Sequence, residues 1–399
     1  MPAPENDKYL DRYAQSLMGV YGRPKAVLTH GQGCYVWDAD GNRYLDLLAG
    51  IAVNALGHGH PAVVGALCQQ AASLIHVSNF FATPPQIELA ERLLTVAGAP
   101  SGSAVFFANS GTEAIEAAIK LSRRTGRTRL VAAEAAFHGR TTGALALTHK
   151  QAYREPFEPL IASVTHVPLN DEAALRAAVN TEVAALFLEP LQGEAGVVEA
   201  DPAYLRLARE LTTASGTLLI IDEIQTGVGR TGTWFAFQQA GIVPDAITVA
   251  KGLGAGVPIG ALVTFGPDVS GLLTAGQHGT TFGGNPLAAA AGLAVLDTIE
   301  AQGLLAHATS VGNHLVEAVA ALAHPLIRGV RGAGLLRAVE LSADVSATVA
   351  ERALSAGFII NAPIPDALRL APPLVITTAQ VDSFVTALPA LLDGLGPTS

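Results

Sequence analysis

The sequence predicts an α/β fold in which helices flank a mostly parallel central sheet. Six short apolar runs read as strands buried on both faces, as the strands of a parallel sheet are. Alanine-rich segments with helical periodicity separate most of them, and 41 glycines punctuate the 399-residue chain. The predicted strands span residues 104–108, 130–133, 185–188, 218–221, 246–249 and 259–264.

The two ends of the chain read as a smaller α+β unit. Residues 35–38 and 44–46 predict a hairpin with its turn at Ala39-Asp40-Gly41-Asn42. In the tail, helices are expected at residues 303–322 and 378–392, and strands at residues 332–341 and 357–361. We therefore expect an N-terminal segment (1–54) packed on the small domain, a large domain (55–298) and a small C-terminal domain (299–399).

The charge and composition of the chain limit the kinds of molecule that it is expected to bind. A net charge of −10 and the lack of any Lys/Arg run oppose nucleic-acid binding. Cys34 and Cys68 have no zinc-site spacing, so no metal is expected. Polar and turn residues interrupt the longest uncharged stretch, 269–296, which argues against a membrane span, and the acidic N-terminus favours a cytoplasmic location. Small molecules are the expected partners.

Polar residues follow several predicted strands at their carboxyl ends, where open α/β sheets bind ligands. The first group is Asn109-Ser110-Gly111-Thr112-Glu113, which opens a helix expected at residues 114–124. The backbone N–H groups and the dipole of that helix suit a phosphate. The spacing of Ser110 and Glu113 also fits a capping box, which needs no ligand, and capping is favoured for this motif taken alone.

Asp222 and Lys251 each end an apolar run. A buried carboxylate such as that of Asp222 needs a partner. The partner could be a protonated pyridine nitrogen, or Asp222 could cap or pair with another group of the fold, and the two interpretations are equally favoured for this residue taken alone. Lys251 enters the glycine-rich segment 252–256, where a partly desolvated amine can form a Schiff base. A lone lysine beside glycines is usually a solvated loop residue, so the prediction depends on the combination of these features.

The segment Gly227-Val228-Gly229-Arg230-Thr231-Gly232 matches the dinucleotide-binding pattern G-x-G-x-x-G, and Asp245 lies downstream for a ribose contact. However, the preceding strand ends near Asp222, five positions before Gly227, and no small-residue helix start follows the last glycine. An NAD-dependent oxidoreductase is therefore kept as the alternative. A catalytically silent binding module on the same fold is the third hypothesis.

Seven short motifs occur in order along nearly the whole chain. They are Gly57-His58-Gly59-His60-Pro61, Asn109-Ser110-Gly111-Thr112-Glu113, Phe137-His138-Gly139-Arg140, Glu189-Pro190-Leu191-Gln192-Gly193-Glu194, Asp222-Glu223-Ile224-Gln225-Thr226-Gly227, Lys251-Gly252 and Thr280-Thr281-Phe282-Gly283-Gly284-Asn285-Pro286. In this order they resemble the class III, fold-type I aminotransferases, most closely the acetylornithine aminotransferase branch. The resemblance implies the pyridoxal-phosphate-dependent transferase fold.

The resemblance implies pyridoxal 5'-phosphate (PLP) as the cofactor. Lys251 is then the Schiff-base lysine and the general acid/base, and Asp222 pairs with the pyridine nitrogen. Phe137 matches the position that stacks on the ring, and Gln225 the position near the ring hydroxyl. The remaining cofactor-binding positions are Ser110, Gly111, Thr112, His138, Thr280 and Thr281. The family reaches the phosphate with the Thr281 position of the neighbouring subunit, which implies a homodimer.

The resemblance also implies substrate residues. Arg140 and Arg369 match carboxylate-binding positions, and each guanidinium offers a planar fork suited to that group. Glu194 resembles a switch that pairs with Arg369 for a monocarboxylate donor and moves away for glutamate. The other expected substrate residues are Ile51 and Val53, and an apolar Ile51, where ornithine aminotransferases tend to carry tyrosine, favours N-acetylornithine.

The implied reaction transfers the δ-amino group of N-acetylornithine to 2-oxoglutarate, as in arginine biosynthesis. Its products are N-acetylglutamate 5-semialdehyde and glutamate. Ornithine, succinylornithine, succinyldiaminopimelate and GABA remain alternative amino donors.

Overall fold

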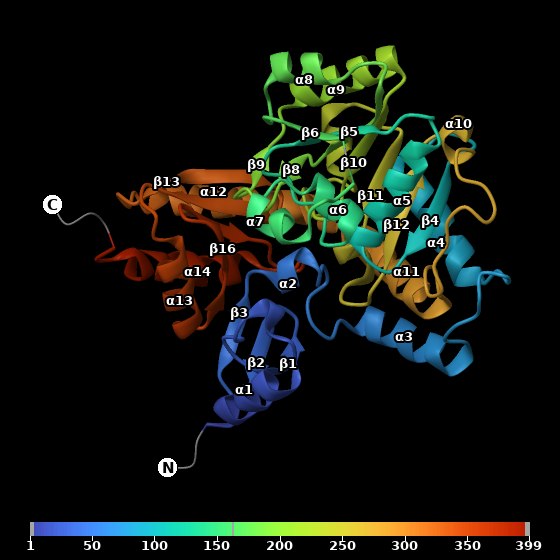
Figure 1. Cartoon of the computed structure of the whole chain (residues 1–399). Coiled ribbons are helices and arrows are strands. Elements are labelled where there is room, and N and C mark those ends of the chain that lie inside the picture. Colours follow the sequence, from blue (N-terminus) through green and yellow to red (C-terminus); the bar gives the residue numbers. More distant parts are fainter. Residues whose placement is uncertain (1–3, 162, 396–399) are drawn as a thin grey trace.

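The computed structural model describes residues 4–161 and 163–395 (Figure 1). In this part of the chain a seven-stranded sheet forms the centre, and two four-stranded sheets and a two-stranded ribbon accompany it. Figure 1 places the large sheet and its helices in one half of the molecule, with the N-terminal and C-terminal segments on the other side. Residues 1–3 and 396–399 of the expected terminal parts lie outside the described residues.

The central sheet has the strand order β4-β12-β11-β10-β7-β5-β6. Its strands are β4 (Ala104–Ala108), β5 (Arg129–Ala133), β6 (Val164–Val167), β7 (Val183–Leu188), β10 (Leu218–Asp222), β11 (Ala246–Val249) and β12 (Gly260–Thr264). Every pair from β11 to β6 is parallel, whereas β12 runs antiparallel to both of its neighbours. The predicted α/β fold with a mostly parallel sheet is confirmed.

Strand β6 was missed by the sequence analysis. It is an edge strand with the sequence Val-Thr-His-Val, and only Val167 in it is fully buried. The six predicted runs include the other edge strand, β4, whose sequence Ala-Val-Phe-Phe-Ala is apolar throughout, and all residues of β7, β10, β11 and β12 are buried. An edge strand needs little apolar surface, and the Thr and His of β6 interrupt the apolar run by which the other strands were found.

Helices cover both faces of this sheet. Alternate residues of a strand point to opposite faces, and here they pack in different apolar clusters. Ile220 of β10 packs in the cluster that contains Ile115 of α5 (Gly111–Arg123). Its neighbour Ile221 packs in the larger cluster with residues of α4 (Pro84–Ala97), α9 (Pro202–Ser215) and α11 (Pro286–Ala301). Burial of both faces explains why the strands read as continuous apolar runs.

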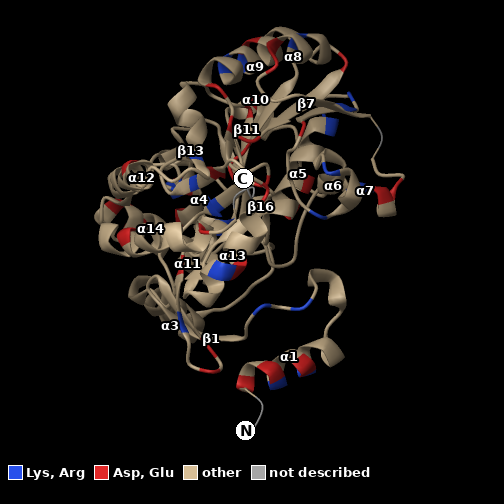
Figure 2. Cartoon of the chain, turned by 90° about the vertical axis from the view of Figure 1, so that its left-hand side faces the viewer, with Lys and Arg blue, Asp and Glu red and all other residues tan. Residues whose placement is uncertain are grey.

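A second sheet joins the two ends of the chain. It contains β1 (Leu28–Gln32), β2 (Tyr35–Asp38), β3 (Arg43–Asp46) and β15 (Phe358–Ile359), in that order. The antiparallel pair of β2 and β3 confirms the predicted hairpin, and β15 adds to β3 in parallel. Before this sheet come α1 (Glu5–Ser16) and η1 (Gly19–Tyr21). Figure 2 shows several acidic residues along α1, and hydrogen bonds from Glu5 and Asn6 to the Asp40 carboxylate tie this helix to the hairpin turn.

The C-terminal part contains the sheet β13-β14-β17-β16 and three helices. Its elements are α12 (Leu304–Ala321), β13 (Ile327–Ala333), β14 (Leu336–Leu341), α13 (Ser346–Ser355), β16 (Asn361–Ile364), β17 (Ala367–Leu370) and α14 (Thr378–Leu392). The prediction of one strand at 332–341 is wrong, because Gly334 (φ +53°) turns the chain between β13 and β14. The strand expected at 357–361 is in fact β15 and the start of β16.

The remaining elements connect these parts. They are α2 (Ala49–Ala52), α3 (Pro61–Ser73), α6 (Thr142–Leu147), α7 (Gln151–Arg154), η2 (Glu155–Phe157), α8 (Glu172–Ala178), β8 (Leu191–Gln192), β9 (Val198–Glu199), η3 (Ala236–Ala240), η4 (Lys251–Gly254) and α10 (Pro267–Ser270). The domain boundaries stay a prediction, and the one expected after residue 298 falls inside α11. Within the described ranges no single helix is long and apolar enough to cross a membrane. Only α11 and α12 taken together pass such a test, across a bend of 67°.

Candidate active site

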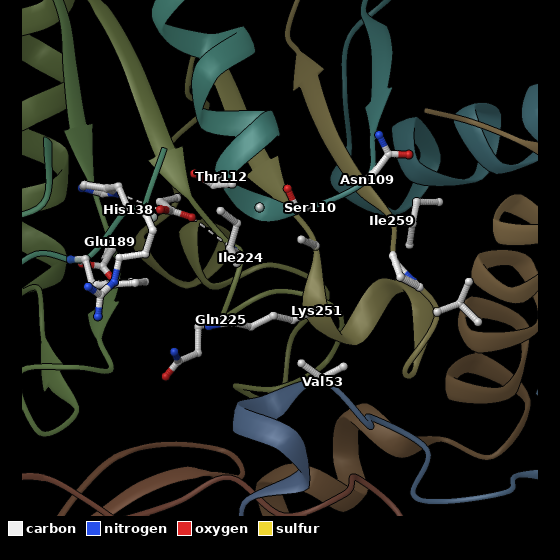
Figure 3. Close-up of a pocket in the computed structure, with 18 of the residues that line it drawn as sticks. Val53, Asn109, Ser110, Thr112, His138, Glu189, Ile224, Gln225, Lys251 and Ile259 are labelled. Atoms are coloured by element: carbon white, nitrogen blue, oxygen red, sulfur yellow. Dashed lines mark hydrogen bonds and ion pairs between the residues drawn. The ribbon is translucent and has the colours of Figure 1, made fainter. Parts of the chain in front are cut away.

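A cavity of about 440 Å³ lies where β10 and β11 end (Figure 3). It brings together ten of the residues that the sequence analysis singled out, namely Val53, Ser110, Gly111, Thr112, Phe137, His138, Arg140, Asp222, Gln225 and Lys251. Five other predicted residues do not line it: Ile51, Glu194, Thr280, Thr281 and Arg369. These ten residues come from five separate segments of the sequence and meet at one edge of the sheet, as the fold class requires of a ligand site.

Lys251 is separated from the end of β11 by Ala250 alone and starts the short helix η4 with a left-handed φ of 42°. In Figure 3 its side chain points toward Gln225, with Val53 on one side and Ser110 on the other. Its amine makes no hydrogen bond to any described residue. Burial and the charge of Arg369 lower the pKa of Lys251 to about 8, although nearby carboxylates oppose this change. The site therefore presents an amine that is readily deprotonated.

Asp222 ends β10, and its carboxylate is almost fully buried. Oδ1 accepts hydrogen bonds from the Thr248 hydroxyl (3.0 Å) and the Ile224 backbone N–H (3.1 Å). Oδ2 pairs with Nδ1 of His138 at 2.7 Å. These contacts fix the carboxylate, and its negative charge stays inside the cavity wall.

His138 and Glu189 complete this buried wall. Burial lowers the pKa of His138, but the hydrogen bond and charge of Asp222 and the charge of Glu189 outweigh it, so the net direction is upward. Nε2 of His138 is buried without a hydrogen-bond partner among the described residues. Burial raises the pKa of Glu189 to about 8, and its carboxyl group accepts the backbone N–H of Phe137 at 3.0 Å. Three titratable groups therefore interact in one desolvated cluster.

Glu189 is a cavity residue to which the sequence analysis gave no role. It directly follows β7, which is buried throughout. Asp222 was singled out because it is a polar residue at the end of a buried apolar run. The same rule, applied to the end of β7, would have identified Glu189. The other unassigned lining residues are Asn109, Gly139, Ile224, Ala250, Gly256, Val257, Pro258 and Ile259.

The N-terminus of α5 forms another wall. Ser110 is the N-cap, and its hydroxyl accepts the Glu113 backbone N–H at 3.3 Å. The reciprocal bond of a capping box is missing, because the Glu113 carboxylate instead binds the backbone and side chain of Asn109. Asn109 also donates to the Thr280 hydroxyl at 2.9 Å. The cap uses the N–H of Glu113. Gly111 and Thr112, which line the cavity, are the first residues of the helix, so their N–H groups have no intrahelical partner.

Arg369 on β17 is buried beside the cavity rather than in its wall. Its Nη1 pairs with Glu194 at 2.6 Å and lies 3.4 Å from the Gln225 side-chain oxygen. Its Nη2 donates to Asn361 at 2.7 Å, and its Nε is buried with no partner within the described ranges. The Glu194 side chain is 37% exposed, so it can leave for solvent while Asn361 still holds the guanidinium.

Arg140 lies at the rim and is exposed. Its guanidinium carbon stacks 3.5 Å from the ring centre of Tyr153 and lies 5.7 Å from that of Phe137. It forms no ion pair with any residue that the structure describes. A planar cation is thus oriented by two aromatic rings and free to meet an anion from the cavity.

The segment before Val53 has an unusual backbone. Ala49, Gly50, Ile51 and Ala52 all have left-handed φ values, between 51° and 65°. Hydrogen bonds from the Leu48 and Ala49 N–H groups to Asp46 hold the start of this turn. The turn directs Val53 into the cavity and leaves Ile51 37% exposed. Backbone strain of this kind is concentrated at functional sites.

Thr281 is exposed and lies outside the cavity of its own chain. It belongs to a loop that Asn79 ties down by donating to the carbonyls of Thr280 and Gly283, each at 3.3 Å. Large apolar side chains surround this loop, and Phe80 is 93% exposed. Phe81, Phe282 and Ile75 are exposed there as well. Such a gathering of exposed apolar side chains is typical of an interaction surface.

The G-x-G-x-x-G segment plays a different, structural role. Asp245 precedes β11 and therefore lies at the opposite end of the sheet from Lys251. It pairs with Arg209 at 2.9 Å and accepts the Leu219 N–H at 2.7 Å. Arg230, within the segment, is buried and donates to backbone carbonyls of the C-terminal part. The segment joins two parts of the fold and lines no part of the cavity.

The fold and the cavity define a site for a small molecule, with a buried lysine in its lining. Comparison with known proteins gives the family: the model for class-III aminotransferases matches residues 19–392. The chain belongs to this family and is an aminotransferase.

Similar proteins cover the chain almost completely. The acetylornithine aminotransferase of Mycobacterium leprae is 54% identical over 382 residues, which are 96% of this chain and 94% of that protein. The acetylornithine aminotransferase of Streptomyces coelicolor is 52% identical over 395 residues, covering 99% and 98%. Among solved structures, the ornithine aminotransferase from Toxoplasma gondii superposes with a TM-score of 0.92 at 31% identity, covering 98% of this chain and 96% of that chain. The predicted family and fold are confirmed.

Proposed function

We propose that this aminotransferase uses PLP to transfer the δ-amino group of N-acetylornithine to 2-oxoglutarate. The observation that carries the proposal is the Lys251 amine, which has a pKa of about 8 and no hydrogen bond to a described residue, in one cavity with the Asp222 carboxylate. The names of the relatives from Mycobacterium leprae and Streptomyces coelicolor support the choice of donor. The products are N-acetylglutamate 5-semialdehyde and glutamate.

The chemistry of the cavity fits this cofactor. Lys251 would hold its aldehyde carbon, and Asp222 would face its ring nitrogen. Phe137 would cover the ring, Gln225 would lie near the ring hydroxyl, and the Gly111 and Thr112 end of α5 would receive the phosphate. When bound, PLP supplies a carbonyl that accepts the amino group and a ring that draws electrons from the substrate carbon.

The residues of the chain supply the remaining steps. With the cofactor bound, the Lys251 amine would act as the general base and acid that moves the proton at the substrate carbon bearing nitrogen. Its lowered pKa leaves part of the amine deprotonated near neutral pH. Three hydrogen bonds hold the Asp222 carboxylate in place, where it would face the positively charged part of the bound cofactor. The buried wall of His138 and Glu189 excludes water from this side.

Substrate recognition uses the two arginines. Arg140 binds the carboxylate at the far end from the reacting carbon, which is the α-carboxylate of N-acetylornithine and the γ-carboxylate of glutamate and 2-oxoglutarate. Arg369 is neutralised by Glu194 while the donor, which has no second carboxylate, is bound. For glutamate or 2-oxoglutarate, Glu194 rotates to solvent and Arg369 receives the second carboxylate. The apolar side chains of Ile51 and Val53 suit an acetylated donor better than a charged one.

A homodimer completes the site in this proposal. Thr281 of one protomer binds the phosphate in its partner's cavity, together with the Thr280 segment. The exposed position of Thr281 and the apolar side chains of Phe80, Phe81 and Phe282 around it support such an interface.

The proposal is tested by following the visible absorption band of the purified holoenzyme. We expect N-acetylornithine to bleach the band and 2-oxoglutarate to restore it, because the two substrates drive opposite half-reactions. Bleaching by ornithine, succinylornithine, succinyldiaminopimelate or GABA, but not by N-acetylornithine, would replace the donor. A protein that binds NAD and takes up no PLP would overturn the proposal.

The Glu194→Gln variant tests the switch. The amide cannot neutralise Arg369, so the half-reaction with N-acetylornithine is expected to slow by about tenfold while that with glutamate changes little. Equal effects on both half-reactions would contradict the switch.

A further inference from the structure

We propose that Glu116 is a positioning residue that fixes the Arg140 loop, residues 139–144, through Thr141. Glu116 lies on α5 and does not line the cavity. The inference rests on the proposed carboxylate-binding role of Arg140. It concerns how that arginine is held, which the resemblance and the comparisons leave open.

A single carboxylate oxygen gathers three donors from this loop. Oε1 of Glu116 accepts the Thr141 hydroxyl at 2.5 Å, the Gly143 N–H at 2.9 Å and the Ala144 N–H at 3.2 Å. Thr141 is the N-cap of α6, yet its own side chain caps nothing. Glu116 therefore does for α6, from a different helix, what an N-cap side chain normally does. Its negative charge also suits the helix N-terminus.

The donor and acceptor roles of the hydroxyl groups connect Thr112 to the same contact. An ionised carboxylate only accepts hydrogen bonds, so the one hydroxyl proton of Thr141 points to Glu116. The hydroxyls of Thr141 and Thr112 are 2.8 Å apart, and Thr112 must then be the donor. Thr112 Oγ1 also accepts the Thr141 N–H at 3.3 Å. The Thr112 hydroxyl is thus committed to the loop, and its backbone N–H is the group left for a ligand.

Two glycines allow this close approach. A Cβ on Gly143 would collide with the Glu116 carboxylate, and a Cβ on Gly139 would collide with Thr112 Oγ1. Gly139 also has a φ of 135°, which side chains rarely adopt. The sequence motif that contains Arg140 thus has its backbone packed directly on α5.

The loop is held on both sides of Arg140. Before it, the Thr148 hydroxyl accepts the His138 N–H at 3.0 Å and lies 3.2 Å from the Gly139 carbonyl. After it, Thr141 is held by Glu116. Between these anchors only the Arg140 side chain is exposed, stacked on Tyr153. Removal of the Glu116 anchor leaves the guanidinium free to move away from the position where a carboxylate would meet it.

The experiment compares Glu116→Ala, Glu116→Gln and the matched surface control Glu210→Ala in the holoenzyme. The rate of amide hydrogen exchange in the peptide 139–147 shows whether the N-terminus of α6 is still capped, and it can be measured without any enzyme activity. KM and kcat for glutamate and 2-oxoglutarate report whether Arg140 still binds the substrate carboxylate. For Glu116→Ala we expect amide exchange on the order of tenfold faster and KM for both substrates raised about tenfold, with kcat within about threefold. Glu116→Gln keeps an acceptor oxygen and should recover most of the KM effect.

The outcomes separate this inference from the proposed function. Faster exchange with unchanged KM would mean that Glu116 caps α6 and does not position Arg140, which overturns the inference. Unchanged exchange would overturn it as well. A fall in kcat at constant KM would also reject it, because positioning of a binding group acts on KM first. If the wild-type enzyme reacts with glutamate but not with N-acetylornithine, the proposed donor fails while the comparison of the variants still decides on Glu116.

Discussion

The cavity has two walls that are built in different ways. At the strand ends, Asp222, His138 and Glu189 are buried and bonded to one another or to the backbone. Outside this wall, Arg140 at the rim and Ile51 and Thr281 beyond the lining residues are exposed, and their positions come from the backbone or from aromatic stacking. One wall is complete within a single chain. The exposed side chains form no ion pair with the described residues, which suits the proposed binding of substrates and a second subunit there.

This difference predicts where substitutions act. Changes in the buried wall should affect the chemical step, because these groups hold charge in a site shielded from water. Changes at the rim should affect binding and assembly, because exposed groups contribute mainly through the ligand they meet. Five predictions test this contrast, from the largest expected effect to the smallest.

Lys251→Ala should lower turnover at least ~10⁴-fold, because nucleophile and general base are lost together. The fold should survive, since the amine has no hydrogen-bond partner among the described residues. Measurement of kcat and of the thermal midpoint Tm checks both parts. A variant that keeps more than about a hundredth of the activity would rule out the assignment of Lys251.

Asp222→Asn should lower kcat by about 10²–10³-fold, because the amide keeps the shape of the carboxylate and loses its charge. Asp245→Asn is the matched control: it is also a carboxylate next to a strand of the same sheet, but at the opposite end. We expect its kcat to stay within about threefold of the wild type. Similar losses in the two variants would show that the effect is not local to the cavity.

Thr281→Ala should weaken cofactor binding by about tenfold, because one hydrogen bond to a charged phosphate is lost. Mixing of the Thr281→Ala and Lys251→Ala chains sharpens this test. In a mixed dimer, the site with an intact Lys251 would receive an intact Thr281 from its partner, so half of the sites should regain native cofactor affinity. If mixing restores nothing, Thr281 does not act across an interface.

The pH dependence of Lys251 tests the buried wall in the cofactor-free protein. Only the deprotonated amine attacks an aldehyde, and a pKa lowered to about 8 leaves roughly one amine in ten deprotonated at pH 7. The rate of labelling by a small aldehyde should therefore rise about tenfold per pH unit up to about pH 8 and then level off. A rate that keeps rising to pH 10 would show an unshifted amine.

Thr112→Val should have the smallest effect. The substitution keeps the side-chain shape and the backbone N–H, and removes the hydroxyl that faces Thr141. We expect cofactor affinity to change less than about threefold, as measured by titration of the cofactor-free protein with PLP. A loss as large as that expected for Thr281→Ala would mean that the hydroxyl itself holds the phosphate.

Most of the fold was predictable because its strands are buried on both faces and therefore apolar throughout. The same physics explains the failures. Strand β6 is an edge strand with one buried residue, and the turn at Gly334 interrupts an apolar run without changing its composition. Local sequence carries no information about which face of a short run meets solvent or where a tight turn reverses it.

The candidate site was predictable where a polar residue borders a buried strand, as with Asp222 and Lys251. Contacts between distant segments were not. His138 and Asp222 are 84 positions apart, and only the folded chain brings them to 2.7 Å. The left-handed run at residues 49–52 was equally hidden, because two alanines and an isoleucine give no signal for positive φ.

That left-handed run affects how this enzyme can change during evolution. Each non-glycine residue in it carries a penalty of about 1–2 kcal/mol, so the shape persists only because other groups hold it. The holding groups are main-chain atoms and the Asp46 carboxylate, and none is the side chain of Ile51 or Val53. These two side chains can be exchanged one at a time on an unchanged loop. With the donor-binding role proposed for these two residues, a new range of amino donors would require a point mutation and no new backbone.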